Sequence, residues 1–314
     1  MRIKLGVIMD PIESIKPYKD STFAMMLAAQ KRGWEIFYML PGDCYLENGK
    51  AFAHMCPLQV EDNNSDWFEK GEGLDRELAA LDVILMRVDP PFNMDYIYTT
   101  YLLEYAESQG TLVVNKPASL RDVNEKLYAG WFADCCPTTL VSASAARHKQ
   151  FLQQHKDIIV KPLDGMGGAS IFRLRENDPN INVVLETMTN FDSTQIMAQT
   201  FIPEISEGDK RVLLVDGVPA PFALARIPAK GETRGNLAAG GRGVAVPLSE
   251  QDKRICARVA PTLREKGLLF VGLDIIGDYL TEINVTSPTC IRELDRDCDL
   301  DIAGDLMDLI ASRI

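Results

Sequence analysis

The sequence predicts an α/β fold built in more than one part, with a smaller α+β lid, on three observations. Apolar strand candidates alternate with helix candidates in the first third of the chain. After about residue 120 the texture changes to hairpins and Gly-rich loops. The chain has 314 residues, more than one hydrophobic core usually serves, so we expect separate parts with a cleft between them.

The first third contains four strand candidates and one well-specified helix. The strand candidates are Lys4–Met9, Glu35–Met39, Val83–Met86 and Leu112–Val114. Ser21 or Thr22 can cap a helix that runs to Lys31. The turn after the first strand reads Asp10-Pro11-Ile12-Glu13, without a Gly-x-Gly-x-x-Gly motif, so a dinucleotide site is not expected. Segment 40–75 shows no pattern that assigns it.

The remaining two thirds alternate short strands with Gly-bearing turns and end in helices. Strands are expected at Asp157–Lys161, Ile171–Leu174, Gln195–Phe201, Arg211–Val215 and Pro221–Ile227, and around Asp274 and Glu282. Helices are expected at about Gln251–Lys266 and Asp301–Ser312. Segment 228–243 is rich in glycine, lacks apolar periodicity and is about as long as unstructured loops become in compact domains. We interpret it as a mobile active-site flap.

The charge balance excludes some partners. With 33 Lys and Arg against 45 Asp and Glu, the net charge is −12 and the sequence pI is near 4.8. This disfavours a binder of duplex DNA and a polybasic membrane module, but leaves room for a small, locally charged ligand. Half of the net charge lies in Glu293–Asp308, where seven acids face only Arg296. Such a run is usually a solvated face.

Location and redox state follow from simple counts. No stretch approaches the roughly 20 apolar residues that cross a bilayer, and the N-terminus lacks the pattern of a secretory signal, so we expect a cytoplasmic protein. The seven cysteines are odd in number and show no Cys-x-x-Cys spacing, which favours reduced, structural thiols. His54, His148 and His155 match no metal-binding motif, and we expect them on the surface.

A Gly-rich turn, Gly165-Met166-Gly167-Gly168, is the first candidate for chemistry. Backbone N–H groups in such a turn can approach an anion without interference from Cβ atoms. Taken alone, the turn is more simply read as a tight connection between strands. The nearby Lys161, at the end of an apolar strand, and Lys126 favour a phosphate site, although Lys126 taken singly fits a solvated surface lysine equally well.

A metal site is the second candidate. Glu282 and Asn284 lie two residues apart on one strand, so their side chains project from the same face. With a three-residue turn at 277–279, Asp274 lies directly across from Glu282. Carboxylate and carbonyl oxygens are the ligands that magnesium prefers, and phosphate oxygens commonly complete its shell. A polar strand face in water is the alternative, but the preceding segment is highly apolar.

Cations gather between residues 206 and 246 in spite of the acidic total. This segment carries a local charge of +2 from Lys210, Arg211, Arg226, Lys230, Arg234 and Arg242 against four acids. Arginine offers a bidentate fork to phosphate or carboxylate. Arg211 and Arg226 adjoin apolar strands and are the better candidates, whereas Lys230 and Arg242 fit ordinary surface charges.

Taken together, these stretches resemble the ATP-grasp superfamily and, within it, the prokaryotic-type glutathione synthetase family. The resemblance spans nearly the whole chain and rests on the following runs: Val7-Ile8-Met9-Asp10-Pro11, Met86-Arg87-Val88-Asp89-Pro90-Pro91, Asn115-Lys116-Pro117, Lys161-Pro162-Leu163-Asp164-Gly165-Met166-Gly167-Gly168, Glu232-Thr233-Arg234-Gly235-Asn236-Leu237-Ala238-Ala239-Gly240-Gly241 and Glu282-Ile283-Asn284-Val285-Thr286-Ser287-Pro288-Thr289-Cys290. At the hinge the chain has Thr200-Phe201 where the family pattern has Asn-Tyr, and Val123 replaces a small polar residue. Neither change touches a charged position.

The resemblance implies an ATP-grasp fold with a Rossmann-like N-terminal substrate domain at 1–122, a lid at 123–203 and a C-terminal part at 204–314. It implies ligation of γ-glutamylcysteine to glycine through an acyl phosphate, with ATP converted to ADP and phosphate and with one or two Mg²⁺ or Mn²⁺ ions. A homotetramer is also implied.

The resemblance assigns a role to each candidate residue. The implied ATP contacts are Lys126, Lys161, Gly165, Met166, Gly167, Gly168, Gln199, Thr200, Phe201, Ile202 and Asp209. The implied metal ligands are Asp274, Glu282 and Asn284. Arg211, Arg226 and Arg234 are implied in catalysis, and the implied substrate contacts are Arg87, Ser287, Thr289 and Arg292.

Two other functions remain open. One is another carboxylate–amine ligase of the same superfamily, of the D-alanine–D-alanine or glutamate-adding type, and the other is a nucleotide-binding protein without chemistry. The runs that contain Asp10 and Arg87 belong to substrate recognition in the glutathione synthetase family, so they favour that family over another ligase. The charged and polar set disfavours a nucleotide-binding protein without chemistry; its members are Asp274, Glu282, Asn284, Arg211 and Arg226. We expect Asp274→Ala and Glu282→Ala to abolish turnover and to leave folding intact.

Overall fold

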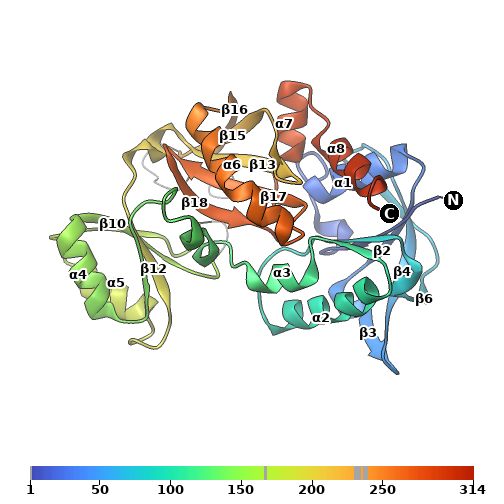
Figure 1. The fold of residues 1–314 in the computed structure, drawn as a ribbon, viewed down its shortest axis with the longest axis horizontal. Helices are drawn as coiled ribbons and strands as arrows, with labels where there is room; N and C mark the ends of the chain where they lie inside the picture. The colour runs from blue at the N-terminus through green and yellow to red at the C-terminus, as the bar shows by residue number, and fades with distance from the viewer. Residues whose placement is uncertain (1, 166–167, 230–234, 236–239) are drawn as a thin grey trace.

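The structure is a computed structural model that describes residues 2–165, 168–229, 235 and 240–314. These residues form three separate β-sheets with helices packed against them. The N-terminal sheet lies at one end of the molecule, the lid sheet at the other, and the C-terminal sheet between them (Figure 1). Residues from all three sheets can therefore line one cavity.

The N-terminal sheet is built on four parallel strands in the order β2-β1-β7-β8. They are β1 (Lys4–Ile8), β2 (Glu35–Met39), β7 (Val83–Met86) and β8 (Leu112–Val114), close to the predicted ranges. Helix α1 (Ser21–Lys31) connects the first two. Its cap is Asp20, which accepts a hydrogen bond from the Phe23 N–H at 2.7 Å, so the predicted caps Ser21 and Thr22 lie one residue or more inside the helix.

Segment 40–75, left unassigned above, extends this sheet with antiparallel strands. The strands are β3 (Cys44–Glu47), β4 (Lys50–Val60), β5 (Phe68–Lys70) and β6 (Leu74–Glu77). β4 pairs with all three others and with β2. Two helices that the sequence did not predict follow, α2 (Met94–Ser108), capped by Asn93, and α3 (Pro117–Asp122).

The lid is a four-stranded sheet in the order β11-β10-β12-β9. Its strands are β9 (Thr139–Ser142), β10 (Asp157–Pro162), β11 (Phe172–Arg175) and β12 (Ile196–Thr200). Helices α4 (Ala145–His155) and α5 (Ile181–Met188) cover it at the far end of the molecule (Figure 1). The lid has its own small core around Phe151, Ile158 and Leu185.

The C-terminal sheet has the order β16-β15-β13-β17-β18, with β14 on β13. Its strands are β13 (Asp209–Val215), β14 (Val218–Pro219), β15 (Phe222–Ile227), β16 (Arg242–Pro247), β17 (Phe270–Ile276) and β18 (Tyr279–Asn284). The helices are α6 (Glu250–Glu265), α7 (Ile291–Cys298) and α8 (Ile302–Ala311). Short 3₁₀ turns complete the chain at Ile12–Ser14, Pro41–Asp43, Leu78–Ala80, Leu127–Phe132 and Pro203–Glu207.

The two larger cores are shared between the N-terminal and C-terminal sheets. One joins Ile8 and Met86 to Val212 and Leu273, and the other joins Leu5 to residues of α7 and α8. Neither shares a residue with the lid core. Residues 127–132, which the sequence places with the lid, contribute to the first of the shared cores.

Some expectations need correction or lie outside the described residues. His148 is fully buried in the lid rather than on the surface, with Nε2 at 2.9 Å from the Ser142 carbonyl. In the acidic run, Glu293 and Asp295 are half-buried, while the acids from Asp297 to Asp308 are exposed. The predicted flap at 228–243 falls mostly on residues that are not described, and its end belongs to β16.

Two other expectations concern the described residues as a whole. All seven cysteines are free thiols, as predicted. Within the described parts of the chain, helices that combine the length and apolarity needed for a membrane span are absent.

Candidate active site

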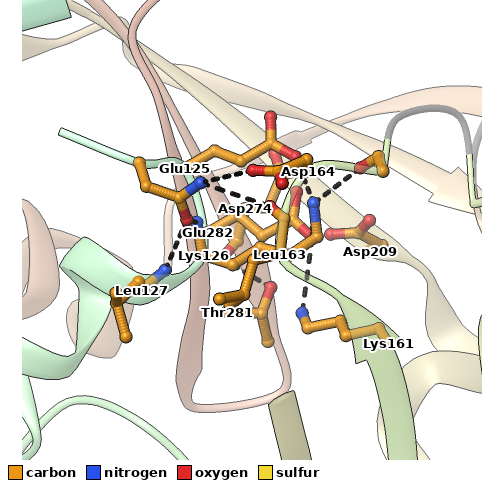
Figure 2. Close-up of polar contacts among 12 residues, drawn as sticks. Glu125, Lys126, Leu127, Lys161, Leu163, Asp164, Asp209, Asp274, Thr281 and Glu282 are labelled. Carbon is orange, nitrogen blue, oxygen red and sulfur yellow. Dashed lines mark hydrogen bonds and ion pairs between the residues drawn. The ribbon is translucent and has the colours of Figure 1, made fainter. Parts of the chain in front are cut away.

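A cavity of about 550 Å³ lies where the three sheets meet. Its walls come from the turn after β1, from Gly165, Gly168 and β12 of the lid, and from β13, β17 and β18. Figure 2 shows Lys126, Lys161 and Glu282 among the polar side chains that gather there. The charged residues predicted from separate motifs are therefore brought to one place.

Arg211, Arg226 and Asp274 form a buried ion cluster on neighbouring strands of the C-terminal sheet. Arg211 stands opposite Asp274 in the β13–β17 register and donates to both of its carboxylate oxygens, from Nε at 2.5 Å and from a terminal nitrogen at 3.0 Å. Arg226 lies 2.9 Å from the same carboxylate. Burial alone would raise the pKa of Asp274, but the two guanidinium groups hold that pKa below its usual value.

Asp209 holds the far side of Arg226. Its Oδ2 accepts a hydrogen bond from Arg226 at 2.5 Å, while Oδ1 is buried and has no hydrogen-bond partner among the described residues. Burial raises the pKa of Asp209 to about 7, against the opposing effect of Arg226. Arg226 therefore bridges two carboxylates, only one of which has both oxygens satisfied.

Two lysines meet Glu282 at the boundary between the lid and β18. The Glu282 carboxylate lies 3.3 Å from Lys161 Nζ and 3.7 Å from Lys126 Nζ. Lys126 also contacts Glu125 and donates to the Gly165 carbonyl at 2.6 Å. Burial, reinforced by the charge of Glu282, raises the pKa of Glu125. Lys126 thus contacts the first residue of the Gly-rich turn. Met166 and Gly167 of that turn are outside the described residues.

One part of the cavity wall, here called its apolar end, carries mostly apolar side chains. Gln199, Thr200, Phe201 and Ile202 line it at the end of β12, together with Ile159 and Ile171. Gln199 is held by a hydrogen bond from its Nε2 to Thr139 at 3.1 Å. A ligand with a flat, largely apolar ring system fits this part of the cavity, with any anionic group of the ligand toward Lys126 and Lys161.

The N-terminal wall of the cavity contains both charge types. Arg87 lies on this wall, but its guanidinium is buried and donates to Thr22 Oγ1 and to the Pro288 carbonyl, and burial lowers its pKa to about 10. Ser287 contacts Asp89, and Thr289 also lines the cavity. Lys16 and Lys19 line this wall without a carboxylate partner among the described residues.

One predicted site residue that the structure describes does not line the cavity. Arg292 was predicted to contact substrate, but it is absent from the cavity wall and pairs with Asp62 at 2.6 Å. It points away because α7 begins at Ile291 and carries its first turn against α1, where the Ile291 N–H donates to Ser21 Oγ at 3.2 Å. Arg234 lies outside the described residues.

The metal prediction is matched only in part by the donor set. Asp274 and Glu282 are direct cross-strand partners and Asn284 follows on the same strand, all facing the cavity. Asn284 Nδ2 is buried and has no hydrogen-bond partner in the described part of the chain. Across the described residues, clusters of three or more His, Cys, Asp or Glu suited to a metal are absent. The donors therefore fit a divalent cation that takes most of its remaining ligands from phosphate and water.

Comparison with known proteins decides the family. The family model for the N-terminal domain of prokaryotic glutathione synthetase matches residues 3–121, and the model for its ATP-grasp domain matches residues 125–299. The chain belongs to the prokaryotic glutathione synthetase family. A glutathione synthetase from Vibrio vulnificus is 61% identical over 100% of this chain and 99% of its own, and one from Pseudomonas aeruginosa is 60% identical over the same shares. Members of this family are ATP-dependent ligases of glutathione biosynthesis, and the chain is accordingly an enzyme.

Solved structures outside the family share the fold. The D-cycloserine synthetase DcsG has a TM-score of 0.70 at 14% identity, over 98% of this chain and 99% of its own. The ATP-grasp ligase PsnB, complexed with a minimal precursor, has a TM-score of 0.66 at 15% identity over the full length of both chains. At such low identity the likeness shows the ATP-grasp fold alone.

Sequence reasoning on the family motifs missed several wall residues. Glu125 is adjacent to a predicted lysine, and its proximity to Glu282 depends on a backbone bond from the Ile283 N–H to the Glu125 carbonyl at 2.7 Å. Lys16 and Lys19 follow the Asp10-Pro11 turn that was singled out. Their place on the cavity wall is visible only in three dimensions.

Proposed function

We propose that the enzyme joins the cysteinyl carboxylate of γ-glutamylcysteine to the amine of glycine, with ATP converted to ADP and phosphate. One observation carries this proposal. A single cavity is lined by Lys126 and Lys161, by the carboxylates of Asp274 and Glu282, and by the N-terminal wall that contains both charge types. The chain's relatives named glutathione synthetase match it along its whole length. A cavity of this kind lets two acceptors and one phosphoryl donor meet out of water.

ATP lies across the lid and the C-terminal sheet in this proposal. Lys126, Lys161 and the turn from Gly165 to Gly168 hold its phosphates, because both lysines line the cavity and a Gly-rich turn can offer backbone N–H groups to an anion. Gln199 to Ile202 hold the base at the apolar end, where β12 offers backbone groups as well as side chains. Asp209 faces the same cavity from the start of β13.

The dipeptide lies against the N-terminal wall. A γ-linked glutamyl residue keeps its own α-carboxylate and α-ammonium groups, so its binding site needs both charge types. Lys16 and Lys19 supply cations, and Asp10, Asp89 and Glu293 supply carboxylates on the same wall. Arg87, Ser287 and Thr289 complete it. An α-linked Glu-Cys dipeptide, whose charges are placed differently, is then a poor substrate.

The reaction needs no protein nucleophile. The cysteinyl carboxylate attacks the γ-phosphorus of ATP with ADP leaving, and the glycine amine then attacks the acyl phosphate with phosphate leaving. Arg211 and Arg226, with Arg234, stabilise the transferring phosphoryl group and the tetrahedral oxyanion. For Arg211 and Arg226 this requires a share of their donors, because Asp274 holds both of them.

Asp274, Glu282 and Asn284 hold Mg²⁺ or Mn²⁺ in this proposal. A bound divalent cation neutralises charge on the terminal phosphates during transfer. The residues themselves keep the carboxylate oxygens aimed into the cavity: Asp274 through its two arginines and Glu282 through its two lysines. Titration of the apo enzyme with Mn²⁺ under electron paramagnetic resonance measures this binding, which Glu282→Gln weakens.

The experiment that tests the function is phosphate release by the purified enzyme with ATP, Mg²⁺, γ-glutamylcysteine and glycine. Release is expected only when all four are present, and mass spectrometry of the product shows glutathione. Lys126→Met lowers the rate strongly, whereas Lys156→Met, at a surface lysine paired with Glu176, leaves it unchanged. Release that ignores the dipeptide, or that prefers D-alanine or glutamate as the acceptor, contradicts the proposal.

We also propose a domain division, a location and an oligomeric state for the enzyme. The division at 1–122, 123–203 and 204–314 assigns substrate binding, lid and metal site to successive parts, and the cytoplasm is the expected location. A homotetramer is supported by a row of exposed apolar side chains on α2, Met94, Tyr98, Tyr101 and Tyr105, at helical spacing. Light scattering after size exclusion gives the mass, and Tyr98→Asp lowers it if this face is an interface.

A further inference from the structure

The apolar end of the cavity is backed by a charged stack that no family motif contains. Arg173 lies on β11, at the edge of the lid sheet and opposite Ile159 of β10. Its Cζ atom lies 3.3 Å from the centroid of the Phe201 ring. Phe201 lines the cavity, whereas Arg173 does not. The guanidinium therefore contacts the ring without reaching the cavity itself.

One residue fixes both members of this stack. Asp157, the first residue of β10, accepts two hydrogen bonds from Arg173, at 2.8 Å from Nε and 2.6 Å from a terminal nitrogen. Its backbone carbonyl accepts a hydrogen bond from the Phe201 N–H at 3.1 Å. The bidentate pairing leaves the guanidinium plane little freedom, and the backbone bond sets the start of the Phe201 side chain.

Phe201 needs such a restraint because it lies in the connection between the lid sheet and the C-terminal sheet. β12 ends at Thr200, and the chain passes through Phe201 and a 3₁₀ turn before entering the C-terminal sheet at Asp209. A ring at the end of a strand keeps rotamer freedom that must be lost when a ligand packs on it. A cation placed on one face of the ring is attracted by its π electrons and removes that freedom beforehand.

We propose that Arg173 is a positioning residue for nucleotide binding, which holds the Phe201 ring in the orientation that receives the nucleobase. This inference rests on the proposed placement of ATP in the cavity. In this proposal the Arg173 guanidinium does more than form a salt bridge with Asp157, because it also holds the Phe201 ring. Phe201, which stands where the family pattern has Tyr, is the ring that Arg173 contacts.

Arg173→Ala tests the proposal by affinity for the nucleotide. The KM for ATP rises about three- to fivefold, as expected for one cation–π contact at a partly exposed site. The kcat and the KM for γ-glutamylcysteine stay near their wild-type values, because Arg173 touches neither the phosphates nor the substrate wall. Arg173→Lys, which keeps a cation but not the bidentate fork, is expected to fall between Arg173→Ala and wild type.

Arg175→Ala is the matched control. Arg175 lies on the same strand and near the same carboxylate, at 3.6 Å from Asp157, and its side chain is 66% exposed. Unlike Arg173, it lies over no aromatic ring of the described residues. It therefore shares any general effect on β11 and on Asp157 without the stack. The KM for ATP in Arg175→Ala is expected to match wild type. Equal rises in both variants overturn the proposal.

A double-mutant cycle with Phe201→Leu separates the stack from other effects of the charge. If Arg173 acts through the ring, Arg173→Ala has no further effect on ADP binding in the Phe201→Leu background. An undiminished effect there overturns the proposal, as does unchanged ADP binding in Arg173→Ala alone. Thermal unfolding of each variant confirms that the lid is folded.

Binding of ADP is measured calorimetrically without dipeptide or glycine, so this readout does not depend on the ligase reaction. A wild-type enzyme that binds ADP but makes no glutathione contradicts the proposed function and leaves the role of Arg173 to the cycle. An active wild-type enzyme with no coupling between Arg173 and Phe201 contradicts the role of Arg173 alone.

Discussion

Asp274 is the residue around which the charges of the site are balanced. It is buried, and both carboxylate oxygens are held by guanidinium groups of Arg211 and Arg226. Glu282, its cross-strand partner, keeps a side chain that is 20% exposed and faces two lysines. The two acids were expected to behave alike on substitution. Their surroundings now separate them.

Asp274→Ala is expected to unfold the enzyme more easily as well as to inactivate it. The substitution leaves Arg211 buried without a carboxylate, and breaking a buried pair from one side costs about 3–5 kcal/mol. Glu282→Ala also inactivates but costs less, about 1–2 kcal/mol, because Lys126 keeps Glu125. Urea unfolding of both variants measures the difference. Equal free energies of unfolding would contradict the buried-cluster account and restore the original expectation.

The Asp274–Glu282 pair could be predicted from the sequence, although for a partly wrong reason. A three-residue turn was assumed, but β17 and β18 are joined by the two residues Gly277 and Asp278. A register shift between Asp274 and Ile275 restores the predicted pair. The guanidinium partners of Asp274 could not be predicted, because they depend on the order of strands β15, β13 and β17.

At the scale of elements, the end of β15 lies tightly against the chain at Gly235. A Cβ atom on Gly235 would lie 2.4 Å from the Arg226 carbonyl oxygen and 3.1 Å from the Asp209 Cβ. The first of these neighbours is backbone and cannot turn aside. Gly235 also lines the cavity. The close approach therefore links the position of this chain segment to Arg226 and Asp209.

Gly235→Ala is expected to lower kcat/KM about tenfold or more, because overpacking costs about 1–3 kcal/mol and falls directly on Arg226. Gly243→Ala is the control: its Cβ would meet the Leu224 side chain at 3.1 Å, and that side chain can move. Steady-state kinetics on both variants make the comparison. Wild-type kinetics in Gly235→Ala would show that the contact with Arg226 is not needed.

The junction of α7 and α8 carries a titrating carboxyl. Burial raises the pKa of Asp295 to about 6 from 3.8, and its Oδ1 accepts a hydrogen bond from the Ile302 N–H at 3.0 Å. For a carboxyl with a raised pKa, the stabilising contribution is complete below the unfolded value and is lost as the pH rises through the folded value.

Asp295→Asn is therefore expected to gain stability over wild type as the pH rises from 5 to 8. The amide keeps an oxygen acceptor for Ile302 and carries no charge, so the melting temperature at pH 8 rises by about 1–3 °C after allowing for partial solvent screening. Asp297→Asn, at an exposed residue whose pKa is lowered by Arg296, is not expected to gain. Differential scanning fluorimetry at the two pH values tests this. A pH-independent difference for Asp295→Asn would contradict it.

On the scale of the whole molecule, Asn115 joins the N-terminal sheet to the C-terminal sheet. Its Nδ2 donates to the Phe270 and Val285 carbonyls, both at 2.7 Å, and its Oδ1 accepts from the Phe270 N–H at 2.9 Å. The side chain is buried and occupies the place of a short stretch of strand between two sheets. The two parts are thereby held as one body.

Asn115→Ala is expected to lower the free energy of unfolding by about 3 kcal/mol or more, because each buried backbone group left without a partner costs about 1–3 kcal/mol. Asn180→Ala is the control, since Asn180 precedes α5 without a side-chain capping bond. Calorimetry shows a lower and broader transition for Asn115→Ala alone. A transition like that of wild type would mean that the packed cores suffice to hold the parts together.

The parallel strands of the N-terminal sheet could be predicted because each is a short apolar run between turn signals. β4 could not be predicted. Its 11 residues include Pro57 and His54, and different parts of the strand pair with β2 and with β6, so its apolar and polar residues do not alternate regularly. The site's three-part construction followed from the family motifs. The positions of Arg292 and Lys16 did not, because each depends on how α7 or the β1 turn packs on another part.

The separate lid core predicts a pattern of amide hydrogen exchange. No strand of the lid sheet pairs with the other two sheets in the described structure, and its small core shares no residue with theirs. The lid can then open while the rest stays folded, so the amide protons of Ile158 and Ala198 exchange at lower opening free energies than those of Val212 and Leu273. Bound nucleotide, which touches both parts, draws the two sets of protection factors together.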